Sequence, residues 1–425
     1  MVSLVLVFIF TMFSTTAVAE ADDSESLKLT VRQLVRQLDD PRLVLRDQAE
    51  EELIALDVTG LDFLPQPSER TSEEVRHRLA RIRQTLERTI AERSLESTRV
   101  KLHGENLSLA DVLTAIENQT HNRIELRDAP REAVTGVTVD FDAALFWSAL
   151  DTVLDQTGMT VYHYNRPHVL EVLPAEPNRR ARTGSASYAG PFRIEPISMA
   201  AQRDLRAGIH TLKLTLEIVW EPRLAPIALR LPLDRLTAMD NKGRSFEISD
   251  SKNVLPVELQ GDVSAVQLSI PLLAPPRDVT RIARLRGTLL TLVPGRVETF
   301  RIEDLGKAKS VEQAHGNVTV RLEDVRQNND GLWDVRIQVR YRDSAGALAS
   351  HRGWIYRNQR FVLNKQGEPI EELAMELTAQ GENSIGFSAT YDLPEGPSAA
   401  AFVYKTPVLF VEMPIEFELK EIELP

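Results

Sequence analysis

The sequence of 425 residues contains no cysteine. Without thiols, the chain cannot perform thiol catalysis, bind a metal through thiolates or form disulfides. It also lacks the cysteine that carries the acyl chains of a lipoprotein. We therefore expect hydrophobic cores, and not covalent crosslinks, to stabilise the fold.

Long hydrophobic runs are scarce as well. The run at residues 4–13 has about half of the roughly 20 apolar residues that a membrane-spanning helix needs. Small and hydroxyl residues follow it, up to Ala17-Val18-Ala19, which is typical of an export signal cut after Ala19, although no Lys or Arg precedes the run. We expect residues 1–19 to be a signal peptide. The mature protein would be soluble, periplasmic or extracellular, not membrane-spanning and not a lipoprotein.

The chain has no excess of positive charge, since 62 Asp and Glu outnumber 50 Lys and Arg, the formal net charge is -12 and the pI is near 5.3. Binding to nucleic acid needs clustered cations, so the composition argues against a nucleic-acid partner. Aromatic residues make up only 6% of the chain, which argues against membrane-crossing strands with aromatic girdles. At roughly 100 to 200 residues per domain, we expect three or four domains.

Residues 27–94 carry the apolar spacing of helices, the first of which is predicted to start at Thr30. The stretches LDDPRLVLRDQAEEELIAL and SEEVRHRLARIRQTL resemble bacterial HEAT-like repeats, in which an Asp-Pro start, an arginine and small residues recur on paired helices. On this resemblance, two short repeats would bury their faces against the next domain or a partner. The mixed charges, including residues 50–52, predict a solvated helix face.

A duplication organises residues 99–174, because Gln119-Thr120 recurs 37 positions later as Gln156-Thr157. Each copy reads as a strand, an apolar helix and a second strand, and the Gln-Thr pair is predicted to end the helix. We expect one compact two-layer α/β domain with its helices on one face of a small sheet.

This stretch resembles the short N-terminal domain of secretins and TonB-dependent receptors. The segments VKLHGENLSLADVLTAIENQTHNRIEL and VTVDFDAALFWSALDTVLDQTGMTVYHYNRPHVLEVL have that family's strand, leucine-rich helix, helix exit and returning strand. The resemblance implies contacts with other proteins and no chemistry. In secretins a pore-forming region follows the domain, and no later segment of this chain resembles one.

The remaining sequence has the period of strands. A polar linker is predicted at residues 175–190, followed by two tandem antiparallel β-sandwiches at 191–306 and 313–425. Both blocks open with an alternating strand containing an inward tryptophan, Trp220 or Trp333. Both then contain a turn of similar composition, at 240–243 and 364–367, and close with another alternating strand. We know no named family for this region.

Sequence motifs for catalysis are lacking, so no catalytic residue and no cofactor is predicted. His163 and His168 flank a predicted hairpin turn and are the candidates for metal binding. A metal needs three or four ligands, however, and polar turn residues explain the pair more simply. On one predicted strand the row Arg336, Arg340 and Arg342 predicts a mixed-charge sheet face or, less simply, a site for an acidic polymer.

Trp147 is the candidate for partner contact. It lies beside the inward face of its helix, where its counterpart 37 positions earlier is Ala110. A large aromatic in place of a methyl group indicates a contact with the neighbouring domain or a partner, and additional core is equally plausible.

Together these features predict an exported, non-enzymatic binding or assembly protein of the bacterial cell envelope, with a multidomain α+β fold and a protein partner. A carbohydrate-binding protein or hydrolase with a site in the sandwich loops is the alternative. A component of an outer-membrane secretion channel is the second alternative.

Overall fold

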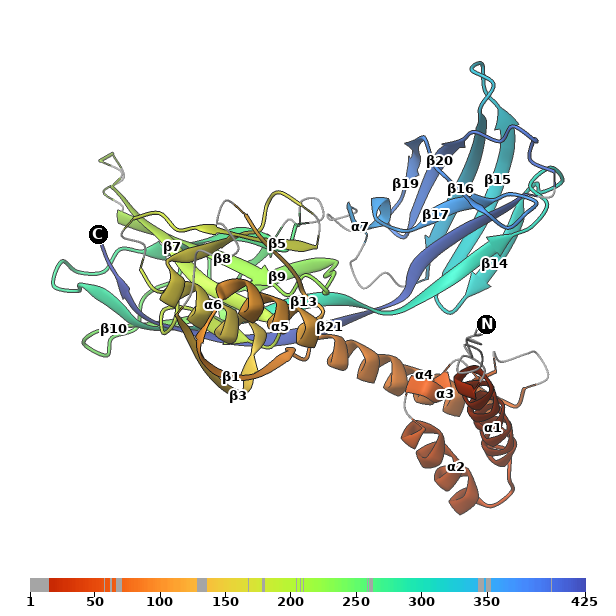
Figure 1. The fold of residues 1–425 in the computed structure, drawn as a ribbon, viewed down its shortest axis with the longest axis horizontal. Coiled ribbons are helices and arrows are strands. Elements are labelled where there is room, and N and C mark those ends of the chain that lie inside the picture. The colour runs from red at the N-terminus through yellow and green to blue at the C-terminus, as the bar shows by residue number, and fades with distance from the viewer. Residues whose placement is uncertain are drawn as a thin grey trace, which may run out of the picture. The chain divides into compact units, whose positions relative to one another are not determined.

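The computed structural model describes residues 15–425 except 57, 62, 66–70, 128–135, 167, 178–179, 204, 207, 209, 258, 260–262, 343–347, 349–352 and 399. It has the mixed α+β architecture that the sequence predicts, with helices first and several sheets later (Figure 1). The chain divides into two compact units, Met1–Ile90 and Ala91–Pro425. The apolar run of the expected signal peptide, residues 4–13, lies outside the described residues.

Helices make up the first unit and continue to its boundary: α1 (Thr15–Gln37), α2 (Leu43–Ala55), α3 (Val58–Leu61) and α4 (Glu73–Ser94). Helix α1 runs without a break through Thr30, so the predicted helix start at that residue is wrong. The Thr30 hydroxyl instead donates to the Ser26 carbonyl one turn earlier. The core of the unit consists of apolar residues from all four helices and two leucines that follow helices, Leu38 and Leu64 (Val31, Leu34, Leu38, Ala49, Leu53, Leu61, Leu64, Val75, Leu79, Ile82 and Leu86).

One buried guanidinium organises the charges of this unit. Arg78 donates to Glu50 and to Glu74, both at 2.6 Å, and lies 2.9 Å from Asp47. Glu51 and Glu52 are exposed as predicted, but Glu50 is largely covered and also accepts from Arg81. The prediction of a solvated face is therefore wrong for Glu50, because an arginine on another helix covers it.

Within Ala91–Pro425, the two strand-helix-strand copies occupy their predicted places. The first is β1 (Arg99–Leu107), α5 (Leu109–Thr120) and β2 (Arg123–Leu126), and the second is β3 (Val137–Leu145), α6 (Phe146–Thr157) and β4 (Met159–Tyr162), followed by β5 (Val169–Pro174). Both helices end after their Gln-Thr pair, where His121 and Gly158 adopt the left-handed conformation that closes a helix.

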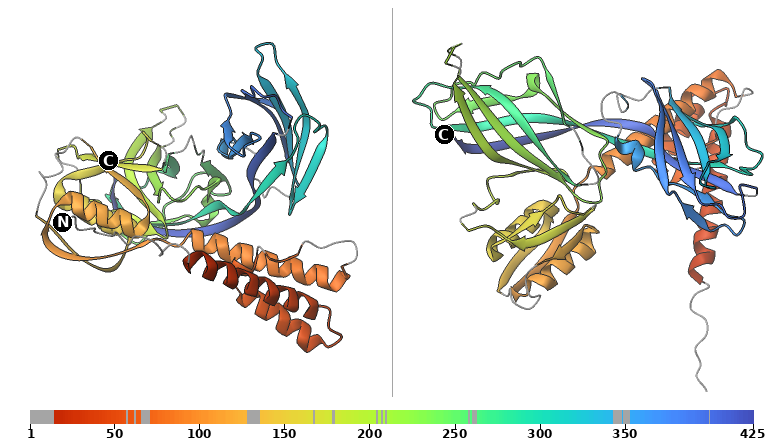
Figure 2. Two further views of the ribbon diagram at one scale, coloured as in Figure 1. Left: turned by 45° about the vertical axis from the view of Figure 1, so that its right-hand side comes forward. Right: turned by 90° about the horizontal axis from the view of Figure 1, so that it is seen from above.

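The strands of this α/β domain form two sheets in place of the single sheet that we expect from the sequence. Strand β1 pairs with β3, and the order of the other sheet is β2-β5-β4. Each sheet thus takes one strand from each copy. Both helices share one core with apolar residues of both sheets, so the helices form a layer between them (Figure 2).

The first β-sandwich core lies beneath a sheet of order β12-β8-β7-β6. The strands in this part of the chain are β6 (Ser187–Ala189), β7 (Phe192–Arg203), β8 (His210–Trp220), β9 (Ala228–Pro232), β10 (Thr237–Asp240), β11 (Val254–Val257), β12 (Ala265–Leu273) and β13 (Arg281–Ile302). A 3-10 turn lies at Leu233–Arg235.

The second core lies beneath a sheet of order β14-β15-β16-β20-β19. Its elements are β14 (Val311–His315), β15 (Val318–Gln327), β16 (Trp333–Tyr341), α7 (Gly353–Tyr356), β17 (Arg360–Leu363), β18 (Pro369–Glu371), β19 (Ala374–Gln380), β20 (Ser384–Tyr391) and β21 (Ala401–Glu423). Trp220 is buried in the first core, and Trp333 packs half-buried against the second.

The two long strands β13 and β21 belong to both cores. They pair antiparallel from Arg281 opposite Glu423 to Ile302 opposite Phe402 (Figure 1). Phe300, on the later half of β13, lies in the second core, whereas Phe417, on the later half of β21, lies in the first. The sequence predicts that residues 313–425 form the second sandwich alone. In the structure the segment 413–423 instead completes the first sandwich, because β21 continues along β13.

The two β regions share part of their topology. The order β12-β8-β7-β6 corresponds to β20-β16-β15-β14, and β10 pairs with β13 as β17 pairs with β21. The two turns of similar composition also match in detail. Asp240 Oδ1 accepts from the amides of Lys242 and Arg244, and Asn364 Oδ1 accepts from those of Gln366 and Glu368.

Candidate functional site

The α/β domain packs on the outer face of the four-stranded sheet of the first sandwich. Val219 on β8 and Ala265 on β12 belong to the core of the α/β domain, while Leu216 and Ile218 on β8 belong to the sandwich core. This sheet is therefore covered on both faces. Burial on two faces explains how the charged Arg193 side chain of β7 becomes inaccessible to water.

Arg193 on β7 is the centre of the contact. The side chain is fully buried, with Nη1 donating to Asp151 Oδ1 at 2.8 Å and Nη2 lying 3.4 Å from Glu195 Oε1 and 3.8 Å from Glu217 Oε2. Its guanidinium also lies over the ring of Trp147, 4.8 Å from the centroid. Groups from α6, β7 and β8 thus share one cation at the contact between the domains.

Asp151 on α6 is the carboxylate that lies closest to Arg193 in this network. It accepts from Arg193 and, at 2.9 Å, from the hydroxyl of Tyr188. Burial raises the pKa of Asp151 to about 6, although Arg193 and Tyr188 oppose the rise. Burial, together with the contact with Asp151, raises the pKa of Tyr188.

Glu221, at the end of β8, forms a second buried contact. Its carboxylate accepts from the Ser97 hydroxyl, from the amide and hydroxyl of Thr98 and from the buried Asn122 side chain. Arg223 balances its charge at 2.7 Å. The start of β1 and the end of α5 are thereby fixed to the first sandwich.

Residues 180–189, which lie within the predicted linker 175–190, are part of the same contact. The amide and hydroxyl of Thr183 donate to Asp155 on α6, and the amide of Arg182 does the same. The buried Arg182 side chain donates to Glu195 at 3.0 Å. The sequence does not predict this contact, because Asp155 and Glu195, the partners of Arg182 and Thr183, lie outside the segment.

Trp147 lies inside this contact, since only 1% of its surface is exposed. Its indole N–H donates to the Pro191 carbonyl at 3.0 Å, and its ring packs against Phe146, His163 and the Arg193 guanidinium. Trp147 therefore contacts the neighbouring domain. This is one of the roles that the sequence predicts from the difference between Trp147 and its counterpart Ala110. The proposal of partner contact is corrected, because the buried side chain leaves no surface for a partner.

The two candidate metal ligands have different surroundings. His163 is buried, with Nε2 at 3.3 Å from Arg193 Nη2. Because a guanidinium can only donate, that nitrogen accepts and is not available to a metal. His168 Nδ1 lies 2.8 Å from the Pro222 carbonyl. Within the part of the chain that the structure describes, no group of three or more His, Cys, Asp or Glu residues could hold a metal ion.

The row of arginines on β16 and beyond belongs to an outer sheet face of mixed charge. Arg336 lies between Asp324 on β15 and Ser388 on β20, and Arg340 and Arg342 are exposed. Opposite charges on neighbouring strands support the simpler of the two interpretations.

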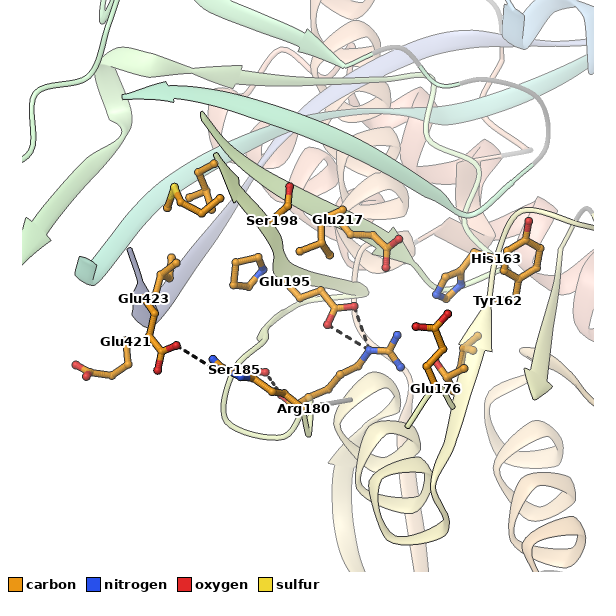
Figure 3. A pocket seen from close by; sticks show the side chains of 18 of the residues that line it. Tyr162, His163, Glu176, Arg180, Ser185, Glu195, Ser198, Glu217, Glu421 and Glu423 are labelled. Carbon is orange, nitrogen blue, oxygen red and sulfur yellow. Dashed lines mark hydrogen bonds and ion pairs between the residues drawn. The ribbon is translucent and has the colours of Figure 1, made fainter. Parts of the chain in front are cut away.

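A cleft of about 870 Å³ opens beside the Arg193 network (Figure 3). Strand β4 lines it with Tyr162, β7 with residues 195–199, and the end of β21 with residues 420–423. This volume lies within the range of roughly 300 to 1,000 Å³ that is typical of ligand pockets.

The walls of the cleft are mixed in character. Tyr162 and Tyr164 are 46% and 38% exposed, and their rings meet edge to face at 5.8 Å. Ile197 and Met199 add apolar surface. Five glutamates and three cations complete the charged lining (Glu176, Glu195, Glu217, Glu421, Glu423, Arg180, Arg182 and Lys420).

Glu195 and Glu217 form a carboxylate pair at the floor of the cleft, directly opposite each other on β7 and β8. Burial raises the pKa of Glu217, with Arg193 opposing the rise and Glu195 adding to it. Tyr164 donates to Glu217 at 3.0 Å. Arg193 Nη2 approaches both carboxylates, at 3.4 Å from Glu195 and 3.8 Å from Glu217, so a guanidinium engages the pair. Carboxylates engaged in this way are not the free acid and nucleophile that flank a glycosidic bond.

The strand edges of the α/β domain differ in their protection. Gln119 bonds through its side chain to the amide and carbonyl of Lys101 on β1, and Gln156 does the same with Thr138 on β3. On β2, the amide of Ile124 donates to Glu117 Oε2. Strand β4 has no such side-chain cap and no second neighbouring strand among the described residues, and this edge lines the cleft.

Two further edges meet at the cleft. Strand β6 pairs only with residues 192–194 of β7, so the described part of β7 beyond them has β8 as its single neighbour. The end of β21 pairs with β13 on one side. Three strands therefore present unpaired edges to one cleft, which the sequence could not reveal because pairing is non-local.

No helix in the described part of the chain is both long and apolar enough to cross a membrane.

Comparisons with known proteins give little guidance. No family model matches the chain, and no curated protein matches it. A solved structure described as the "Atomic model of the Salmonella SPI-1 type III secretion injectisome basal body proteins InvG, PrgH, and PrgK" aligns with 10% identity and a TM-score of 0.15. The alignment covers 76% of this chain and 92% of that one. A TM-score this low does not establish a common fold.

Proposed function

We propose that this protein is an exported, non-enzymatic binding or assembly protein of the bacterial cell envelope, which binds a polypeptide partner at the β4 edge and its cleft. The unequal protection of strand edges is the observation that carries this proposal. Proteins normally cover or cap exposed edges, since unpaired amides and carbonyls attract other chains. Here β1, β2 and β3 are capped by side chains of their own domain, and β4 opens into the cleft.

The two buried contacts at Arg193 and Glu221 support the same function. They hold the α/β domain against the first sandwich, so the walls of the cleft have fixed spacing before a partner arrives. A site that is formed in advance loses less entropy on binding. In strand addition, main-chain hydrogen bonds supply affinity and side-chain pockets supply specificity.

Photo-crosslinking in the producing cells tests the proposal. A photoreactive amino acid replaces the exposed Tyr162 beside the cleft in one variant. In the control it replaces Thr138, which is also exposed but lies on a capped strand. We expect crosslinks to a defined envelope protein from position 162 alone. Absence of any adduct at 162, or the same adducts at both positions, would remove the basis for the proposal.

Saccharide binding is the second candidate, because the cleft combines two exposed tyrosines with paired carboxylates. The tyrosine rings are inclined at 65° and do not form one flat platform, and Arg193 already engages both carboxylates. Binding on a glycan array that is lost in a Tyr162→Ala variant would favour this candidate over a polypeptide partner.

A further inference from the structure

We propose that the partner segment is extended, pairs with β4 as an added strand and places a lysine or arginine side chain beside Glu217. This inference rests on the proposed function and specifies the chemistry of the partner. It depends on the ladder of β4, the walls of the cleft and the charge balance beneath it.

The hydrogen-bond ladder determines which backbone groups of β4 face the cleft. The Ala175 amide donates to the Gly158 carbonyl at 2.9 Å, one step beyond the pair Met159 and Pro174 and in the same register as the antiparallel ladder of β4 and β5. Because hydrogen-bonded pairs alternate along such a ladder, Thr160 and Tyr162 direct their backbone groups to β5. Val161, between them, directs its N–H and C=O to the unpaired side. An added strand would pair with these two groups.

The walls beyond this edge suit a strand with alternating side chains. Ile197 and Met199 on β7 offer apolar surface on one side, and Tyr162 and Tyr164 offer aromatic surface on the other. In an extended segment alternate side chains point to opposite faces. One face of the segment would contact the apolar wall, and a single side chain of the other face would approach the carboxylate pair.

The charges beneath the cleft leave one carboxylate without a close cation. Asp151, Glu195 and Glu217 share two buried guanidiniums, those of Arg182 and Arg193. Asp151 lies 2.8 Å from Arg193, and Glu195 lies 3.0 Å from Arg182. The nearest guanidinium nitrogen to Glu217, on Arg193, is at 3.8 Å. Glu217 instead accepts a hydrogen bond from the hydroxyl of Tyr164, which also lies in the cleft. A cationic side chain would complete the neutralisation, whereas an anionic one would add to the excess.

Peptide selection on the full-length protein tests the inference. Random peptides displayed on phage are enriched on the protein, and the enriched sequences are then measured as synthetic peptides. We expect a recurrent Lys or Arg between β-branched residues. Glu217→Gln should weaken binding by roughly tenfold or more, since a charge-assisted hydrogen bond is lost. The matched change Glu312→Gln, on the exposed face of β14, should leave affinity unchanged.

Backbone pairing is tested on the peptide, so that the protein stays intact. N-methylation of alternate peptide amides should abolish binding in one register and be tolerated in the other, as strand pairing requires. No enriched peptide, enriched peptides without a cation, or equal affinity for Glu217→Gln would overturn the inference. Crosslinking at position 162 would then decide separately whether the proposed function stands.

Discussion

The side-chain amide of Gln119 forms with Lys101 both hydrogen bonds that a neighbouring strand would form. Its Oε1 accepts from the Lys101 amide at 2.9 Å, and its Nε2 donates to the Lys101 carbonyl at 3.1 Å. Gln156 repeats this contact with Thr138, 37 positions later in both partners. The recurrence of Gln-Thr therefore has two physical reasons. The glutamine caps a strand edge, and the threonine hydroxyl bonds back to the helix.

Removing these caps should destabilise the α/β domain and increase self-association. For Gln119→Ala and Gln156→Ala we expect a loss of roughly 1 kcal/mol each in the free energy of unfolding, because two partly exposed hydrogen bonds are lost. Urea unfolding and light scattering measure the two effects. Gln366→Ala, in an exposed turn, is the control and should change neither. If a variant with both changes shows unchanged light scattering and unchanged stability, the glutamines do not protect the edges.

Breaking the Arg193 network should strongly lower the free energy of unfolding. Arg193→Met leaves Asp151, Glu195 and Glu217 with one guanidinium, so we expect a loss of about 3 to 5 kcal/mol. The exposed Arg340→Met change on β16 should cost little. Limited proteolysis should show early cleavage between the α/β domain and the first sandwich in the first variant alone. Unchanged proteolysis and stability would contradict a role for Arg193 in fixing the domains.

The raised pKa of Asp151 predicts a dependence of stability on pH. Its folded pKa of about 6 exceeds the unfolded value of 3.8, so between these values the folded state binds more protons. The stabilisation that Asp151 contributes to the folded state is fully present below about pH 4 and is lost as the pH rises through 6. The free energy of unfolding should therefore fall by up to about 3 kcal/mol relative to Asp151→Asn over this interval. Urea unfolding of both proteins from pH 4 to 7 measures the difference, and a flat difference would contradict the assignment.

The shared strands predict that a change near the C-terminal end weakens the first sandwich. Phe417 on β21 is buried in the first core, so Phe417→Ala should cost roughly 3 to 5 kcal/mol there. Phe387→Ala on β20 is the matched change in the second core. Amide hydrogen exchange should rise mainly in β8 and β12 for the former and in β16 for the latter. The reverse pattern would show that 413–423 does not pack as described.

The sequence predicts local structure well where it is periodic. Alternation and helical spacing place the strands and helices of both duplications, and the unequal pair Trp147 and Ala110 correctly indicates an unequal environment. Strand pairing is not predictable in the same way. Whether β1 joins β2 or β3 depends on contacts between residues far apart in the chain. The cleft escapes the sequence for the same reason, since Tyr162, Glu195 and Glu423 come from three segments that only tertiary structure brings together.

The shared ribbon of β13 and β21 also has a consequence for biosynthesis. The first sandwich cannot close until residues 413–423 have left the ribosome, because Ile415, Phe417 and Leu419 fill its core. Most of the β-rich region therefore stays unfolded until translation is nearly finished. For a polypeptide that is threaded through a membrane before folding, such a delay keeps it competent for translocation.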